Sequence, residues 1–222
     1  MLDACPRCFW LKMHMAFKLP WQIFPGIFSS IDAYTKKVTN LHYDRHTRIP
    51  SWLEDVTGPG VPMDVPGYSK FCVCHRETGV RLTGVPDEMV NVGNGTWILD
   101  YKTAKFTGNQ DKLLPMYRCQ LNGYSLIADT LGMGPVVGLA LVYYEPVTDI
   151  GVNDLPGLLL DAGFRMGFTA KVLPIELDAE LVPGLLARAK DIFEMAKPPG
   201  KRKGCRNCGM LESINQLLAP GR

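Results

Sequence analysis

This chain has no long hydrophobic run and no large excess of charge of either sign. No apolar stretch is long enough to cross a bilayer, and the first residues lack the basic-then-apolar pattern of a secretory signal. We therefore expect a cytoplasmic protein with no membrane partner. The formal net charge of +2 is too small to indicate a nucleic-acid partner by itself. No internal repeat is apparent, so a repeat architecture is not expected.

Cysteine is also scarce, with seven residues in a chain of 222. The odd number of cysteines and the absence of a secretory segment make disulfides the weaker expectation. Four of the seven form two C-x-x-C pairs near the chain ends, Cys5-Pro-Arg-Cys8 and Cys205-Arg-Asn-Cys208. Because a two-residue gap lets both thiolates turn toward one ion or cluster, we predict a four-cysteine metal centre that joins the two ends. The spacing leaves structural Zn²⁺ and an iron–sulfur cluster both open.

A hydrophobic content of 46% in 222 residues is enough for a sizeable core, and the length suits a single α/β domain. Within it we expect a cysteine metal-centre region, made of residues 1–28 and 197–222, and a core over residues 29–196. The other cysteines, Cys72, Cys74 and Cys119, are expected to be structural.

Residues 96–102, Thr-Trp-Ile-Leu-Asp-Tyr-Lys, have the composition of a β-strand. Side chains alternate between the two faces of a strand, so Asp100 and Lys102 project to the same side while Tyr101 faces away. The strand therefore presents a carboxylate and an ammonium as neighbours.

A hairpin is expected to bring a second carboxylate to this strand. The segment Val80–Asp87 alternates in part between apolar and polar residues, and Asn94-Gly95 is typical of a tight turn. Asp87 and Asp100 would then lie on adjacent strands. Two converging carboxylates repel unless a cation lies between them, and hard oxygen ligands suit Mg²⁺ or Mn²⁺. Such an ion can activate water for phosphodiester cleavage, with Lys102 positioning the water or neutralising charge.

A helix is predicted to begin at Pro115 and to end before Gly132, which is placed as its C-terminal cap. Gln120 and Tyr124 are one turn apart on the same face of this helix. An amide and a phenol there can hold a phosphate or a base edge beside the metal.

The three polar patterns follow one another in the order G-x-x-D, D-x-K and Q-x-x-x-Y. In this order they resemble the PD-(D/E)XK nuclease superfamily and, within it, the RecB-like branch. The matching residues are Gly84, Asp87, Asp100, Lys102, Gln120 and Tyr124. The resemblance implies an α/β fold with a restriction-endonuclease-like αβββαβ core, in which helices flank a mixed central sheet, and it makes residues 29–196 the nuclease core.

The same resemblance implies a role for each matching residue. Asp87, Asp100 and Lys102 would be catalytic, and Mg²⁺ or Mn²⁺ would be held by Asp87, Asp100 and the backbone carbonyl of Tyr101. The substrate would be bound by Gln120 and Tyr124.

The N-terminal segment Cys5-Pro-Arg-Cys-Phe-Trp-Leu11 is similar to the start of the iron–sulfur nucleases of the RecB-like branch, including the one used in CRISPR spacer acquisition. Those proteins place one cysteine near the N-terminus and three near the C-terminus, whereas this chain has two and two. The resemblance implies a [4Fe–4S] cluster at the four cysteines. We favour that cluster over structural Zn²⁺, which is the alternative.

RecB-like nucleases often carry a further His or Glu ligand on an upstream helix. The helix expected here begins at Ser29 or Ser30, runs to about Leu41, and contains Asp32 but neither His nor Glu. Glu88 is expected to face the other side of its strand. Nearby alternatives are His42, Asp44 and His46. The number of catalytic metal ions therefore stays open.

The remaining elements are predicted from local pattern. Residues 48–67 are rich in Pro and Gly and are expected to be irregular. Strands are predicted over residues 136–144 and 165–177, and a helix over residues 179–196.

These patterns together predict a metal-dependent nuclease that hydrolyses phosphodiester bonds in DNA, on single strands or at DNA ends. RNA is the alternative substrate. Basic residues that can follow a phosphate backbone are Lys102, Lys105, Lys112 and those of segment 197–203. The rival hypothesis is a nucleic-acid-binding or scaffold protein that keeps the fold without the chemistry.

Overall fold

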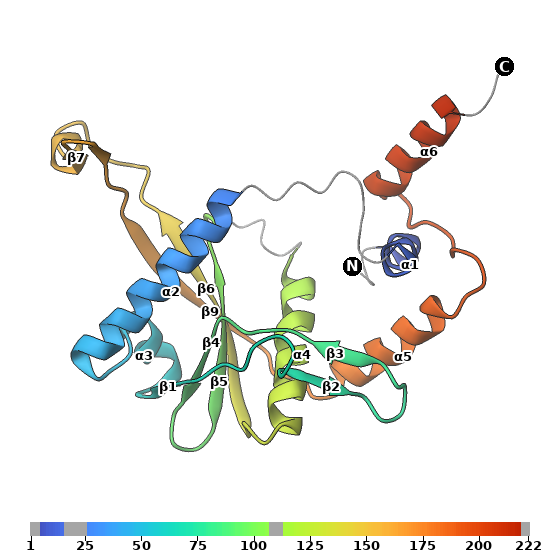
Figure 1. Ribbon diagram of the computed structural model, residues 1–222. Coiled ribbons are helices and arrows are strands. Elements are labelled where there is room, and N and C mark those ends of the chain that lie inside the picture. The colour runs from blue at the N-terminus through green and yellow to red at the C-terminus, as the bar shows by residue number, and fades with distance from the viewer. Residues whose placement is uncertain (1–4, 16–25, 107–112, 219–222) are drawn as a thin grey trace. The chain divides into compact units, whose positions relative to one another are not determined.

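The computed structural model describes residues 5–15, 26–106 and 113–218 of the chain (Figure 1). The described residues form two compact units. The larger unit takes its residues from 24–74 and 81–182, and the smaller one from 1–23, 75–80 and 183–222. Lys112, one of the predicted phosphate-contacting residues, lies outside the described residues.

A five-stranded mixed sheet with the strand order β1-β4-β5-β6-β9 forms the centre of the larger unit. Its strands are β1 (Val61–Met63), β4 (Glu88–Asn91), β5 (Thr96–Lys102), β6 (Val136–Pro146) and β9 (Phe168–Ile175). Strands β5 and β6 are parallel, and the other neighbours are antiparallel. With α2 (Gly26–His46) before the sheet and α4 (Leu114–Thr130) between β5 and β6, the predicted order of helix, three strands, helix and strand is confirmed.

Helices cover both faces of this sheet (Figure 1). On one face, Leu121 of α4 packs in a core with Ile98 of β5. On the other face, Leu53 of α3 (Ser51–Thr57) packs in a second core with Leu99 of β5. Helix α2 is tied to this second face by a hydrogen bond of 2.9 Å between the Thr39 and Tyr144 hydroxyls. Adjacent residues of β5 thus enter opposite cores, as the predicted alternation requires.

The predicted hairpin is present, but its first strand is β4 rather than the segment Val80–Asp87. Its turn is also displaced by one residue from the predicted Asn94-Gly95. Asn91 pairs with Thr96, and the Val92 N–H donates to the Gly95 carbonyl at 2.9 Å, so Gly93 and Asn94 are the central residues of the turn. Gly93 adopts a φ of 88°, and its N–H donates to Asn91 Oδ1 at 2.8 Å. Pro86 has no N–H to donate to a neighbouring strand. The G-x-x-D segment Gly84–Asp87 is therefore not part of β4, which begins at Glu88. The preceding residues form β3 (Arg81–Thr83), which pairs with β2 (Cys72–Cys74) in a separate two-stranded sheet.

Helix α4 begins with Pro in its first turn and ends before Gly132, which has a φ of 75°, as predicted. The prediction for the upstream helix was wrong at both ends. Helix α2 begins at Gly26 and reaches His46, so Ser30 lies inside it, and its hydroxyl donates to the Gly26 carbonyl at 3.4 Å instead of capping the helix. Because Pro50 is the next helix-breaking residue, the sequence allows this longer helix.

Residues 48–67 are also more ordered than predicted, since they contain both α3 and β1. Here Pro50 precedes the first turn of α3, and Gly58, with a φ of 77°, ends that helix. Proline and glycine therefore delimit short elements in this segment rather than prevent them.

The strand predicted over 165–177 is β9, and the helix predicted over 179–196 is α5 (Leu181–Phe193). Between β6 and β9 lie the short 3₁₀ helix η2 (Leu155–Leu158) and the strands β7 (Leu159–Leu160) and β8 (Gly163–Phe164). The smaller unit contains α1 (Pro6–His14) and α6 (Arg206–Leu218). Among the described helices, none has the length and apolar character needed to cross a membrane.

Candidate active site and metal centre

Two aspartates of the larger unit come together where β4 and β5 pair. Glu88 is paired with Leu99 in the antiparallel register, so Asp87, one residue before β4, lies next to Asp100 of β5. The backbone N–H of Tyr101 donates to Asp87 Oδ2 at 2.6 Å, which fixes the Asp87 carboxylate against the neighbouring strand. The structure thus brings the two predicted metal-binding carboxylates to one place.

Asp100 is 3% exposed. Its Oδ1 atom accepts a hydrogen bond of 2.9 Å from the Gln120 amide of α4, and its Oδ2 atom forms an ion pair with the Lys102 ammonium. Burial raises the pKa of Asp100 to about 6, and the nearby charge of Asp87 adds to this rise while Lys102 opposes it. A carboxylate with a raised pKa beside a second carboxylate favours a cation at this position.

Lys102 lies on the same side of β5 as Asp100, as predicted. Its ammonium is 4.6 Å from the centre of the Tyr117 ring, a cation–π contact that restrains the side chain. Tyr117 was not among the predicted site residues. It precedes Gln120 by three positions on α4, so helical spacing from Gln120 and Tyr124 is the signal that identifies it.

Gln120 and Tyr124 also reach the aspartates. The amide nitrogen of Gln120 donates both to Asp100 and, at 2.9 Å, to the Tyr124 hydroxyl. Gly84 lies against the Tyr124 ring so closely that a Cβ at that position would be 2.2 Å from Tyr124 Cε1. The first residue of the G-x-x-D pattern and the last of the Q-x-x-x-Y pattern are therefore in direct contact.

Lys36 of α2 is a member of the site that the predictions missed. Its ammonium lies 2.7 Å from Asp87 Oδ1 and 3.1 Å from Asp32 Oδ2. Burial disfavours its charge, but the hydrogen bonds and charges of Asp87 and Asp32 outweigh that effect and raise the pKa of Lys36. Asp32, the acidic residue noted on this helix, therefore contacts the site through a lysine.

The other candidates for an upstream ligand have different neighbours. His42 Nδ1 is 3.1 Å from the Arg48 carbonyl, and its ring lies 4.6 Å from that of His46. Asp44 lines a cavity of about 390 Å³ together with Asp64, Asp87 and Glu88. Asp44 thus shares a cavity wall with the site, whereas the two histidines pair with groups outside it.

Glu88 faces away from Asp100, as predicted. It is 6% exposed and accepts a hydrogen bond from the Tyr101 hydroxyl on the opposite face of the sheet. Burial raises the pKa of Glu88. This hydrogen bond joins β4 to β5 on the face of the sheet opposite to Asp100. It therefore helps to keep Asp87 next to Asp100.

The donor set at this site suits a hard cation. Asp87 and Asp100 supply carboxylate oxygens from two paired strands, and the backbone of Tyr101 borders the Asp87 carboxylate. Oxygen donors of this kind fit Mg²⁺ or Mn²⁺ and are poor ligands for softer metals. The backbone carbonyl of Tyr101 stays a predicted third ligand.

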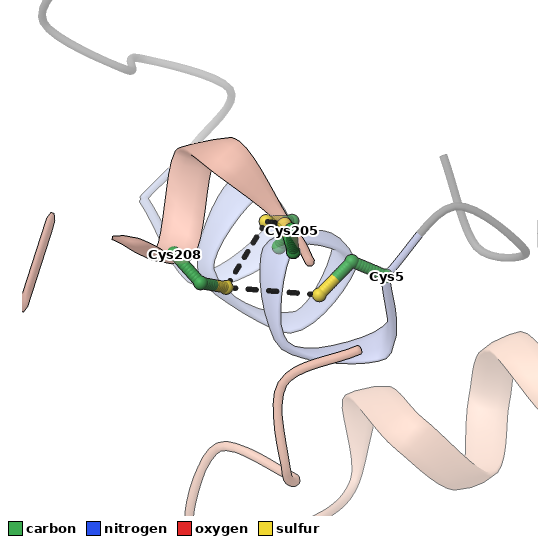
Figure 2. A group of neighbouring side chains, drawn as sticks. Cys5, Cys205 and Cys208 are labelled. Carbon is green, nitrogen blue, oxygen red and sulfur yellow. Dashed lines mark hydrogen bonds between the residues drawn. The ribbon is translucent and has the colours of Figure 1, made fainter. Parts of the chain in front are cut away.

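The four paired cysteines come together in the smaller unit. Their sulfur atoms all lie within 4.8 Å of one another. Cys8 Sγ is 3.5 Å from both Cys205 Sγ and Cys208 Sγ, and Cys5 Sγ is 3.7 Å from Cys208 Sγ. Figure 2 shows the thiols of Cys5, Cys205 and Cys208 directed toward one another. Helix α1 begins directly after Cys5, and α6 begins directly after Cys205, so each pair spans the first turn of a helix.

The backbone around Cys5 favours its thiolate form. Burial disfavours the charged form of Cys5, yet N–H groups of Arg202 and Cys8 donate to its sulfur and lower its pKa to about 6. The Arg202 N–H is 3.4 Å from that sulfur. Cys208, by contrast, is held protonated by burial, which raises its pKa to about 11. A bound metal would compensate the negative charge of the thiolates, so that all four thiols could lose their protons.

A single tetrahedral ion fits the sulfur positions. With Zn–S bonds of about 2.3 Å, the sulfurs of a ZnS₄ tetrahedron are about 3.8 Å apart. Three of the sulfur pairs here are 3.5, 3.5 and 3.7 Å apart, and all four sulfurs lie within 4.8 Å of one another. An iron–sulfur cluster binds each thiolate through a different iron atom and so spreads the sulfurs further apart.

Comparison with protein families gives a match over most of the chain. The model of the PD-(D/E)XK nuclease superfamily matches residues 24–213, a segment that contains both aspartates, Lys102, Gln120 and Tyr124. No curated protein matches the chain.

Proposed function

We propose that this chain, which belongs to the PD-(D/E)XK nuclease superfamily, is a metal-dependent nuclease that hydrolyses phosphodiester bonds in DNA. Single-stranded DNA or DNA ends are the proposed substrates. The order of the G-x-x-D, D-x-K and Q-x-x-x-Y patterns supports its placement in the RecB-like branch.

The observation that carries this proposal is the convergence of three patterns on one carboxylate. Asp100 contacts Lys102 from its own strand and Gln120 from α4, and it adjoins Asp87 from the paired strand. Surface acid–base pairs are common, but a buried aspartate with this set of partners has a high cost unless it serves a site.

Each group has a proposed part in hydrolysis. Asp87 and Asp100 would hold Mg²⁺ or Mn²⁺, which would supply Lewis-acid stabilisation of the phosphate and a more acidic water. Lys102 orients the attacking water and neutralises charge that develops on the phosphate. Gln120, whose amide bridges Asp100 and Tyr124, orients the carboxylate and presents the Tyr124 hydroxyl to the substrate strand.

The test is cleavage of end-labelled single-stranded and double-stranded DNA, and of RNA, in Mg²⁺ or Mn²⁺. We expect the wild type to cleave DNA, and Asp100→Asn and Lys102→Met each to lose at least about 100-fold in rate, since each removes a charged group from the reacting centre. Matched controls are Asp161→Asn and Lys37→Met, which remove the same charges from exposed positions.

Two results would count against the nuclease. Cleavage that persists equally in Asp100→Asn and Lys102→Met would mean that a contaminant cuts the DNA. DNA binding by the wild type without cleavage in either metal would favour the rival, a binding or scaffold protein with this fold.

We also propose that the four cysteines form a structural metal centre in a region separate from the nuclease core of residues 29–196. The sulfur spacing supports Zn²⁺ over the [4Fe–4S] cluster that the family resemblance favours.

A further inference from the structure

Lys36 occupies a position at the aspartates where an additional metal ligand is expected. It projects from α2 to Asp87 Oδ1 at 2.7 Å, and its partner Asp32 lies one turn earlier on the same helix. Helix α2 is held to the sheet through Thr39 and Tyr144, which fixes the part of the helix that carries Lys36. The lysine is therefore delivered to the site by a packed element, not by a free loop.

The two carboxylates each have their own lysine. Lys36 pairs with Asp87, and Lys102 pairs with Asp100. The other oxygen of Asp87 accepts the Tyr101 N–H at 2.6 Å. Both oxygens of Asp87 are thus engaged, which limits how many cations this carboxylate can serve.

We propose that Lys36 is a built-in cation that stands in for a second metal ion, so that the site works with one Mg²⁺ or Mn²⁺. This inference rests on the proposed nuclease function. In two-metal sites the ions lie about 3.5–4 Å apart and are joined by carboxylates. An ammonium 2.7 Å from Asp87 Oδ1 would repel a second divalent ion and already occupies that carboxylate oxygen.

An ammonium can also carry out part of what a second ion does. It has three N–H donors, and the Asp87 and Asp32 contacts account for two of them. The third is able to donate to a phosphate oxygen, adding positive charge where negative charge develops. Lys36 therefore supplies charge without the need for further carboxylate ligands.

The experiment counts the manganese ions bound to the whole 222-residue chain. Electron paramagnetic resonance measures the Mn²⁺ that stays free, in the absence of DNA. Asp100→Asn is titrated in parallel to subtract binding elsewhere. We expect one Mn²⁺ at the wild-type site and two in Lys36→Glu, which replaces the ammonium by a carboxylate beside Asp87 and Asp32. Lys37→Glu makes the same charge change at an exposed position of the same helix and should still bind one.

Lys36→Met provides a milder change if the glutamate variant does not fold. Because it removes a positive charge next to the ion, we expect it to bind Mn²⁺ about tenfold more tightly or better. Its cleavage rate at saturating Mn²⁺ should nevertheless fall. A purely structural lysine would not give tighter metal binding together with slower cleavage.

The outcomes separate this inference from the proposed function. Two Mn²⁺ ions at the wild-type site, or unchanged Mn²⁺ affinity in Lys36→Met, would overturn the role of Lys36 even if DNA is cleaved. One ion in the wild type and two in Lys36→Glu, without cleavage by any form, would support Lys36 as the built-in cation while the nuclease proposal fails.

Discussion

Gly84 shows how a single missing side chain shapes the site. A Cβ at this position would lie 2.2 Å from Tyr124 Cε1, so Gly84→Ala must displace the tyrosine ring. We expect Gly84→Ala to lose about 1–3 kcal/mol of unfolding free energy, and to lower DNA cleavage because the Gln120–Tyr124 hydrogen bond is disturbed. Chemical denaturation and the cleavage assay measure the two effects.

Gly67→Ala is the matched control, since a Cβ at Gly67 meets no atom within 4 Å. Tyr124→Phe separates the ring from its hydroxyl: it should keep the stability and lose only the contribution of the hydroxyl to cleavage. Equal stability of Gly84→Ala and Gly67→Ala would contradict the close contact.

Burial of Asp100 makes stability depend on pH. The pKa of Asp100 is about 6 in the folded chain and 3.8 as the ordinary value, so between these the folded state binds more protons than the unfolded state. The contribution of Asp100 to stability is thus fully present below about pH 4 and is lost as pH rises through about 6. Without divalent cations, wild-type stability should fall relative to Asp100→Asn across this window.

Urea unfolding of both proteins from pH 4 to 7 measures that difference. Subtracting the Asp100→Asn curve removes contributions shared by the two proteins, including those of the cysteines. A difference that is constant with pH would mean that Asp100 is not desolvated. Added Mg²⁺ should reduce the dependence, because a bound cation stabilises the ionised carboxylate.

At the scale of elements, local pattern was sufficient where the partner was close in sequence. Helix α4 follows from Pro115 and Gly132 at its two ends, and the glycines and asparagines before β5 correctly indicated a hairpin, although its first strand is β4 and not Val80–Asp87. The alternation of side chains along a strand correctly placed Tyr101 of β5 and Glu88 of β4 on the face away from Asp100. These features depend on neighbours within one element or one turn, which is the range over which sequence pattern is informative.

The Lys36–Asp87 ion pair could not be predicted in the same way. Its two residues are about fifty positions apart, and α2 shows no pattern that selects Lys36 over Lys37. Packing of α2 determines which of the two lysines reaches Asp87. Thr35 and Thr39 are the buried residues of this helix, and Lys36 lies next to Thr35. Pairing of β2 with β3 likewise depends on tertiary contacts and not on local propensity.

At the scale of the whole molecule, the cysteine centre connects residues about 200 positions apart. Helices α1 and α6 have Cys8 and Cys208 as their buried residues, so apolar packing contributes little to holding them together. Peripheral ion pairs of Glu212 with Arg7 and Lys201 are exposed enough to be weak. The proposed metal would therefore supply most of the association between these two helices, and closing so long a loop would also restrict the unfolded chain.

Removing the metal should consequently unfold one part of the chain and spare the other. After treatment with a strong chelator, we expect amide hydrogen exchange to rise throughout α1 and α6 while β5 and β6 stay protected, since their core is built from apolar side chains that do not involve the cysteines. Cys208→Ser should reproduce the change without chelator. Cys72→Ser, which alters a thiol of the separate β2–β3 sheet, should not.

The same preparation identifies the metal. A colourless protein whose native mass exceeds that of the chain by one zinc ion would agree with the sulfur spacing of 3.5 and 3.7 Å, whereas a brown protein with broad visible absorption would require a [4Fe–4S] cluster and wider sulfur positions. If exchange in α1 and α6 is unchanged after the metal has left, these helices are held by packing instead. The two C-x-x-C pairs would then not be needed to hold α1 and α6 together, and the Cys208→Ser protein should retain the stability of the wild type.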